Sequence, residues 1–265
     1  MTAVITETND SGNPALGSKA AVALFAETSP RSMTVFGTSI KTLFLLLVLI
    51  AGGAWGWATA TQPVAVDLGT GYANTTVTIP GGFWLASFGA FFVGIMVAVN
   101  PRRAALLGVV YAVLEGFCLG AISAMFDAQT DGIVAAAVLA TVSVFLAALF
   151  MYVTRIVKPT QKMAFAVIVG LAGLSLLYLF VWVLAIFDWG FLYSAQFRSI
   201  GIVVTVIAVI LAALSLTLDF AFIEGCVDRD APKFMEWYAA YGLMVTLIWL
   251  YITLLRLLAL LARNR

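Results

Sequence analysis

The stretch GIVAAAVLATVSVFLAALFMYV, residues 132–153, contains no charged side chain. An apolar helix of about 20 residues is what crosses a hydrocarbon layer of about 30 Å. Similar runs recur along the chain, so that 63% of its 265 residues are hydrophobic and 10% are charged. A soluble domain has about 45–50% apolar and about 25% charged residues. The chain is therefore predicted to be an integral membrane protein.

Seven such segments are predicted to cross the membrane as helices. The runs are continuous, whereas a strand of a transmembrane barrel shows about 10 residues of alternating polarity. We therefore expect an all-α bundle of seven transmembrane helices over residues 39–265, preceded by a flexible cytoplasmic N-terminal tail over residues 1–38. The predicted helices cover residues 40–60, 82–99, 104–125, 132–153, 163–187, 200–222 and 237–262.

The basic residues predict which side of the membrane each loop faces. Positively charged loops tend to stay in the cytoplasm. With a cytoplasmic N-terminus, all of the 14 Lys and Arg residues lie inside except Arg198, Arg256, Arg263 and Arg265. The side of the C-terminus stays open, because a last segment that inserts only partly would return its arginines to the cytoplasm.

The chain lacks the residues that many enzyme classes require. It has no histidine, which excludes Ser-His-Asp and Cys-His nucleophile systems and most zinc sites. Its two cysteines show no CxxC spacing, and no glycine-rich phosphate-binding motif follows a strand pattern. The net charge of +1 does not favour nucleic acid as a partner. We expect neither an enzyme nor a bound cofactor.

Two acidic residues lie within predicted helices, where a charge is costly and marks a candidate functional site. Glu115 is near the middle of the third helix, and the spacing of Gly116 and Gly120 after it allows close helix packing. Glu115 is either a structural hydrogen-bonding group or a carboxylate on an ion pathway. Asp219 lies toward the cytoplasmic end of the sixth helix. It either reaches cytoplasmic water or acts as a gate, charged when hydrated or paired with arginine and neutral when the helices close over it.

A charged segment, residues 224–236, separates the last two helices. It is most simply a solvated loop of mixed charge. If the sixth helix continues beyond the membrane, Glu224 and Glu236 come level across the turn, where two carboxylates could attract a divalent cation. Glu236 also begins Glu236-Trp237-Tyr238, whose rings suit a membrane interface.

Several motifs resemble the Bax-inhibitor-1 family of membrane proteins. Residues 111–123, YAVLEGFCLGAIS, resemble the signature of its third helix, and Leu218-Asp219-Phe220 resembles its sixth-helix aspartate motif. Residues 33–38 with Lys41-Thr42, and residues 231–238, resemble a bacterial branch of that family. The resemblance covers nearly the whole chain and implies a location in the bacterial plasma membrane.

The resemblance also implies an architecture and an activity. These are six helices around a central seventh helix, and a pH-sensitive calcium leak. In the family, an acidic pair on the last two helices shares a proton, and an arginine at the end of the second helix can pair with the sixth-helix aspartate. By motif, Asp219 takes the role of that aspartate and Arg102 or Arg103 that of the arginine.

The last predicted helix departs from this pattern, because it has no acidic residue after Glu236. Either Asp219 acts with an arginine and a threonine, Thr246 or Thr253, or Glu236 reaches in from the membrane interface. A threonine hydroxyl can donate a hydrogen bond to Asp219 but does not titrate with it.

These residues lead to one hypothesis and two alternatives. The chain is expected to conduct calcium passively, with protonation of Asp219 shifting the closed–open balance and with Asp219 and Glu115 as the carboxylates that meet the ion. The first alternative is a non-conducting regulator that binds a membrane quality-control protease. The second is a secondary transporter. Membrane lipid and calcium ions are the expected partners.

Overall fold

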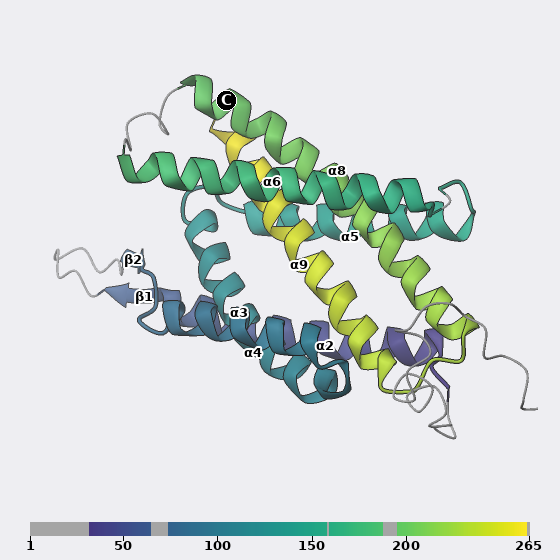
Figure 1. The fold of residues 1–265 in the computed structure, drawn as a ribbon. Helices are drawn as coiled ribbons and strands as arrows, with labels where there is room; N and C mark the ends of the chain where they lie inside the picture. Colours follow the sequence, from purple (N-terminus) through teal and green to yellow (C-terminus); the bar gives the residue numbers. More distant parts are fainter. Residues whose placement is uncertain (1–31, 65–73, 158, 188–194, 264–265) are drawn as a thin grey trace, which may run out of the picture.

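The computed structural model describes residues 32–64, 74–157, 159–187 and 195–263, which are largely helical (Figure 1). The predicted N-terminal tail lies outside the described residues up to residue 31. The helices are α2 (Val35–Ala60), α3 (Phe83–Val99), α4 (Ala104–Asp127), α5 (Ile133–Val153), α6 (Gln161–Phe187), α8 (Ala195–Asp228) and α9 (Met235–Ala262). A 3-10 turn, η1 (Pro101–Arg103), joins α3 to α4.

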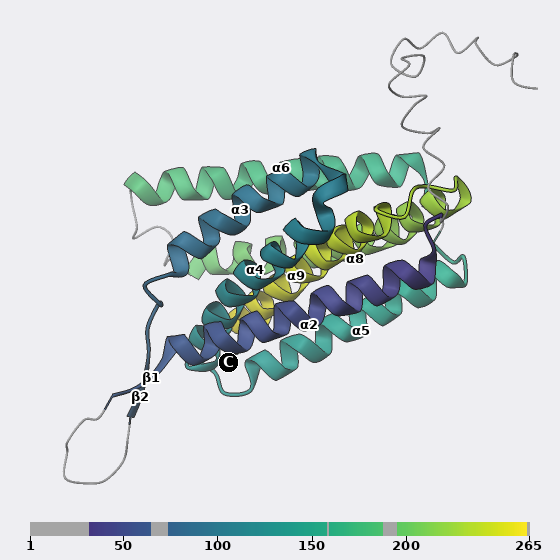
Figure 2. The same cartoon turned by 90° about the horizontal axis from the view of Figure 1, so that it is seen from below.

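The helices form two groups with α9 between them (Figures 1 and 2). In one group α4 packs against α2 and α3, and in the other α8 packs against α5 and α6. The last helix, α9, contacts α2, α4, α5 and α8. Its buried residues face both groups. Met244 and Ile248 pack with α2 and α4, whereas Leu243, Leu250 and Leu254 pack with α5 and α8.

Six of these helices are long and apolar enough to cross a bilayer, namely α2, α4 with the turn before it, α5, α6, α8 and α9. The prediction of a helical integral membrane protein is therefore confirmed. α3 is also apolar but has 17 residues. At 1.5 Å per residue it is about 25 Å long, which is less than the hydrocarbon thickness of about 30 Å. The predicted seven-span count thus depends on α3.

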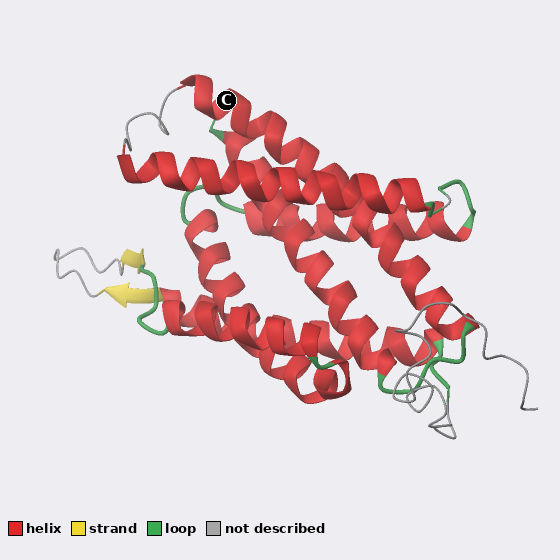
Figure 3. Cartoon of the chain, viewed as in Figure 1, coloured by secondary structure: helices red, strands yellow, loops and turns green. Residues whose placement is uncertain are grey.

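A two-stranded hairpin follows α2 and is not predicted by the hydropathy pattern, while the fold as a whole is all-α. β1 (Thr61–Val64) pairs antiparallel with β2 (Asn74–Val77), with Thr61 opposite Val77. The threonines and valines of these segments suit extended backbone. Figure 3 shows the hairpin projecting from one end of the bundle, which we call the hairpin end.

The opposite end of the bundle gathers basic residues around the turn between α8 and α9, and we call it the basic end. Lys41 and Lys233 form ion pairs there, and Arg102 lies over the ring of Phe234. At the hairpin end, Arg263 donates a 3.2 Å hydrogen bond to the side-chain oxygen of a glutamine between α4 and α5. The ends of α9 therefore lie at opposite ends of the bundle.

Two helix ends differ from the prediction, because polar residues extend the helices beyond the apolar runs. α8 runs from Ala195 to Asp228, whereas the apolar run predicts residues 200–222. α2 begins at Val35, so the boundary predicted between residues 38 and 39 lies inside this helix. The Thr34 hydroxyl accepts a hydrogen bond from the Gly37 amide at 3.0 Å and caps α2, as N-terminal threonines commonly do.

α2 and α4 approach closely because both helices carry glycines where they cross. A Cβ on Gly116 would overlap the carbonyl of Leu49, and one on Gly120 would overlap the carbonyl of Gly53. These are the two glycines whose spacing predicts a helix contact, and they lie directly against the α2 backbone. The contact fixes the position of α4, and with it that of Glu115.

Candidate functional site

Asp219 lies between α8 and α9, where Thr246 is its polar neighbour. The Thr246 hydroxyl lies near the Asp219 carboxyl and donates to the Gly242 carbonyl oxygen at 3.3 Å. The carboxyl oxygen Oδ2 of Asp219 is buried and has no hydrogen-bond partner among the described residues. An unpartnered buried polar atom costs free energy. This oxygen therefore marks a position where a proton, a water molecule or a cation would be stabilised.

The surroundings of Asp219 are apolar. Leu216 and Phe220 of α8 are buried against a cluster that includes Leu243 and Leu247 of α9. An ionised carboxylate in such surroundings loses hydration without gaining a counter-charge. A neutral Asp219 is therefore compatible with close packing of α8 on α9, whereas a charged Asp219 favours entry of water or a cation between them.

The arginines predicted to pair with Asp219 lie at the basic end. The Arg102 guanidinium carbon is 5.9 Å from the ring centroid of Phe234, and Arg103 is exposed at the start of α4. Asp219 takes part in no ion pair among the described residues. The predicted Asp219–arginine pair is thus not formed in this conformation.

The two threonines that the sequence leaves open as partners of Asp219 differ in position. Thr246 lies beside the carboxyl. Thr253 is buried two turns further along α9 and donates to the Trp249 carbonyl oxygen at 2.7 Å. Thr246 is therefore the one of these two threonines that lies next to Asp219.

Glu115 is half-buried on α4, near the ring pair formed by Tyr111 and Tyr241, whose centroids are 5.1 Å apart. α4 and α8 pack on different faces of α9, so Glu115 and Asp219 are not brought together. Among the described residues, no group of three or more Cys, Asp or Glu side chains could hold a metal ion. Contact of Asp219 and Glu115 with calcium stays a prediction.

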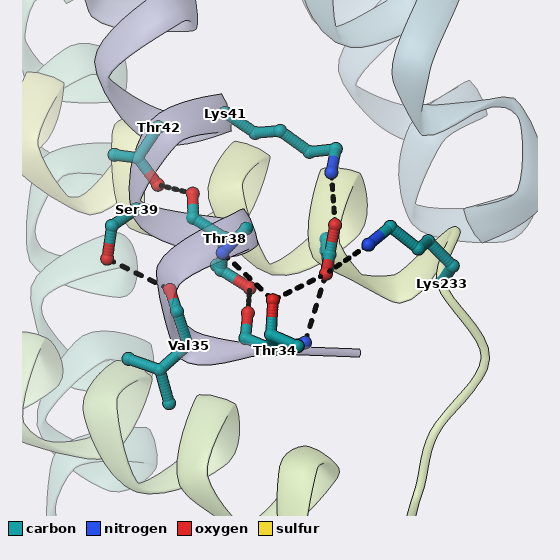
Figure 4. Close-up of polar contacts among 9 residues, drawn as sticks. Thr34, Val35, Thr38, Ser39, Lys41, Thr42 and Lys233 are labelled. Carbon is teal, nitrogen blue, oxygen red and sulfur yellow. Dashed lines mark hydrogen bonds and ion pairs between the residues drawn. The ribbon is translucent and has the colours of Figure 1, made fainter. Parts of the chain in front are cut away.

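A second polar cluster lies at the basic end, where α2 and α9 begin (Figure 4). Glu236, in the first turn of α9, is fully buried and accepts hydrogen bonds from the Thr34 amide and hydroxyl, both at 3.0 Å. It forms ion pairs with Lys41 of α2 and with Lys233, whose Nζ is 3.4 Å from Oε1. Figure 4 shows the Lys41 and Lys233 side chains converging from α2 and from the turn before α9. We call these four residues the Glu236 cluster.

The backbone around the Glu236 cluster is also held in place, by a hydrogen bond and by close packing. The Met33 amide donates to the Ala231 carbonyl oxygen at 2.8 Å, and the Met33 side chain is buried. Gly37 lets the carboxylate approach α2, because a Cβ at that position would overlap it. The segment before α2 and the turn before α9 are therefore joined by backbone and side-chain contacts.

Glu236 is surrounded by positive charge. The Lys41 side chain is 16% exposed and that of Lys233 is 43% exposed, so Lys41 is the less hydrated partner. The N-terminus of α2 adds the positive end of a helix dipole. Thr246 is 10 residues further along α9 than Glu236, which corresponds to about 15 Å. The hypothesis that Glu236 reaches in toward Asp219 is therefore wrong for this conformation.

Glu224 belongs to a separate contact at the end of α8. It accepts a hydrogen bond from the Tyr152 hydroxyl, and its Oε1 is 2.5 Å from Nη2 of Arg155. Glu224 thus faces α5, whereas Glu236 faces α2. The hypothesis that these two carboxylates lie level and together attract a divalent cation does not hold for this conformation.

The Glu236 cluster is not predicted from the sequence. Residues 33–38 and Lys41-Thr42 stand out there only through a family resemblance, and Lys41 has no predicted role in a site. A usable signal was present, because a lysine in the second turn of an apolar helix requires a charged partner. The sequence does not indicate which acidic residue that partner is.

The chain matches one protein-family model, described as Bax inhibitor 1 like, over residues 8–263. The match covers every described helix, both Asp219 and Thr246, and the Glu236 cluster. No curated protein matches the chain. Because the match extends over nearly the whole length, the chain belongs to the Bax inhibitor 1-like family.

Proposed function

We propose that this protein is a passive calcium leak across the membrane and that protonation of Asp219 sets its closed–open balance. The observation that carries the proposal is the buried Oδ2 of Asp219, which has no hydrogen-bond partner among the described residues. An ionisable group placed in this way within a membrane-spanning helix is a functional candidate by default.

The direction of the pH response follows from the packing of α8 on α9. Protonated Asp219 carries no charge and is accommodated beside Thr246 in the apolar contact. When the proton leaves, the charge is stabilised only by water or a cation, which requires α8 and α9 to separate locally. The closed form is therefore favoured at low pH and the conducting form at higher pH.

The same carboxylate supports calcium as the permeant ion. Ca²⁺ prefers oxygen ligands, and α8 and α9 present a carboxylate and a hydroxyl at this point. A negative charge on the pathway also favours a cation over an anion. The proposal requires no energy source.

For the topology, we propose seven crossings with the basic end in the cytoplasm of a bacterial plasma membrane. α3 starts beside the hairpin end and is followed by Arg102, which lies over Phe234 at the basic end. This course supports a crossing by α3 despite its 17 residues. Lys41, Arg102, Arg155 and Lys233 at one end agree with the cytoplasmic preference of basic residues.

The test is calcium flux into dye-loaded proteoliposomes, stepped from pH 6 to pH 8. We expect wild-type flux to rise with pH and Asp219→Asn to give a low flux that no longer depends on pH. Asp228→Asn is the matched control, because Asp228 is exposed at the end of the same helix. Its flux is expected to follow the wild-type profile.

Two outcomes would overturn the proposal. One is folded wild-type protein that gives no flux above empty liposomes at any pH, which would favour the non-conducting regulator of a membrane protease. The other is an Asp219→Asn variant whose flux keeps the wild-type pH profile, which would show that a different group titrates.

A further inference from the structure

A deep apolar groove lies between α2 and α5, with α4 and α9 forming its floor. Its volume is about 670 Å³. The depth comes from small residues, since Gly53 and Ala54 of α2 and Gly120 of α4 line it where larger side chains would fill it. Leu247 and Ile248 of α9 close the groove from below.

Each hydroxyl group that lines the groove already has a hydrogen-bond partner within the protein. Four hydroxyl-bearing residues line it, Thr42, Ser123, Thr141 and Tyr251. Ser123 and Tyr251 are bonded to each other at 2.7 Å. The two threonine hydroxyls donate to backbone carbonyls of their own helices, at 3.0 Å for Thr42 and 2.7 Å for Thr141. Because the other lining residues are mostly hydrophobic, the groove suits an apolar occupant better than water.

The mouth of the groove is continuous with the surface that faces the bilayer. Ile50 of α2 and Val138, Val142 and Leu146 of α5 line the groove and are between 46% and 65% exposed. They lie in the middle parts of two helices of membrane-spanning length. At that depth the surrounding medium is hydrocarbon, so the groove opens toward lipid.

The position of the groove indicates its occupant. The bilayer surrounds the mouth with hydrocarbon chains at this depth, and the hydroxyls of the lining are bonded within the protein rather than open to a polar ligand. A single unbranched hydrocarbon chain is thin and can follow a narrow groove between two helices.

We propose that this groove is a binding site for one acyl chain of a membrane phospholipid. The chain enters between α2 and α5 and contacts α9 at Leu247 and Ile248. Its headgroup stays at the membrane surface and contributes no contact inside the groove. The site does not depend on calcium conduction.

The experiment is photolabelling in nanodiscs of phosphatidylethanolamine and phosphatidylglycerol that contain a trace of phosphatidylcholine with a diazirine in the middle of one acyl chain. Labelled residues are identified by mass spectrometry after proteolysis. We expect adducts on Leu119 and Ser123, which line the interior of the groove, in addition to adducts on outward-facing residues.

The second measurement uses a variant in which larger side chains fill the groove. Ala54→Phe with Thr141→Phe places two rings in the groove and should abolish the labelling of Leu119 and Ser123. Ala51→Phe with Ser143→Phe is the matched control, since both residues are exposed on the same two helices and neither lines the groove. The control should be labelled at Leu119 and Ser123 as strongly as the wild type.

Wild-type protein labelled only on outward-facing residues would overturn the proposal. So would a filled variant that is folded and labelled inside the groove as strongly as its control. If the filled variant does not fold, the wild-type labelling pattern alone decides the question.

Discussion

Lys41 and Glu236, 195 positions apart in the sequence, form an ion pair at the point where α2 and α9 begin. The carboxylate is fully buried and is also bonded to the residue that caps α2. α9 in turn carries Thr246, the polar neighbour of Asp219. The pair therefore fixes one end of the helix on which the candidate gate is built.

Glu236→Ala should destabilise the fold strongly. It leaves Lys41 only partly exposed without its counter-charge, and it removes the acceptor of the Thr34 amide. Removing one partner of a buried pair typically costs about 3–5 kcal/mol. Thermal unfolding in detergent, followed by circular dichroism, measures the loss.

Lys233→Ala is the control for this prediction. Lys233 meets the same carboxylate at 3.4 Å, but its side chain is 43% exposed, and exposed pairs contribute about 0–1 kcal/mol. Its effect should therefore be much smaller. If both variants lose equal stability, the cluster does not depend on the Lys41 pair.

Gly37→Ala should destabilise the protein through the same carboxylate. A Cβ at this position overlaps the Glu236 carboxylate, which Thr34 and Lys41 hold in place. Overpacking of this kind costs about 1–3 kcal/mol. In a Glu236→Ala background the obstruction is absent, so the cost of Gly37→Ala should disappear there.

The matched substitution is Gly225→Ala in α8, where no atom beyond its chain neighbours and its own helix backbone lies within 4 Å of an added Cβ. It should be neutral or stabilise by up to about 1 kcal/mol, because alanine favours a helix over glycine. Equal effects of the two substitutions would show that helix propensity, rather than contact with Glu236, decides the result at Gly37.

Gly120→Ala tests the close contact between α2 and α4. The new Cβ would overlap the Gly53 carbonyl, which is backbone and moves only if the helices separate. We expect a loss of about 3 kcal/mol. Gly173→Ala in α6, with nothing within 4 Å of the added Cβ beyond its own helix backbone, should leave the unfolding temperature unchanged or raise it slightly. A Gly120→Ala protein as stable as this control would contradict the packing described here.

Sequence periodicity and composition predict most of this fold, because long uncharged runs such as residues 132–153 have one stable form in a bilayer. Periodicity and composition do not predict where the helices end. The polar residues after residue 222 extend α8 to Asp228, which hydropathy does not reveal. The β1–β2 hairpin is missed for a related reason, since its short strands pair only with each other.

The candidate site is predictable only in part. Asp219 stands out because a carboxylate within an apolar run is costly. Its neighbour is not predictable, because Thr246 and Thr253 are equivalent in the sequence and only the packing of α8 on α9 separates them. The partner of Lys41 is hidden by the 195-residue separation.

Thr246→Val should shift the pH response of calcium flux while leaving the shape of the side chain nearly unchanged. The Thr246 hydroxyl can stabilise ionised Asp219 by a hydrogen bond, and bonds to charged groups contribute about 1.5–3 kcal/mol. Without that hydroxyl the conducting form loses this stabilisation, so the midpoint of flux should move to higher pH by about one to two units. Thr253→Val is the control on the same helix, because its hydroxyl donates to the Trp249 carbonyl. If the midpoint of Thr246→Val equals the midpoints of the wild type and of Thr253→Val, Thr246 takes no part in gating.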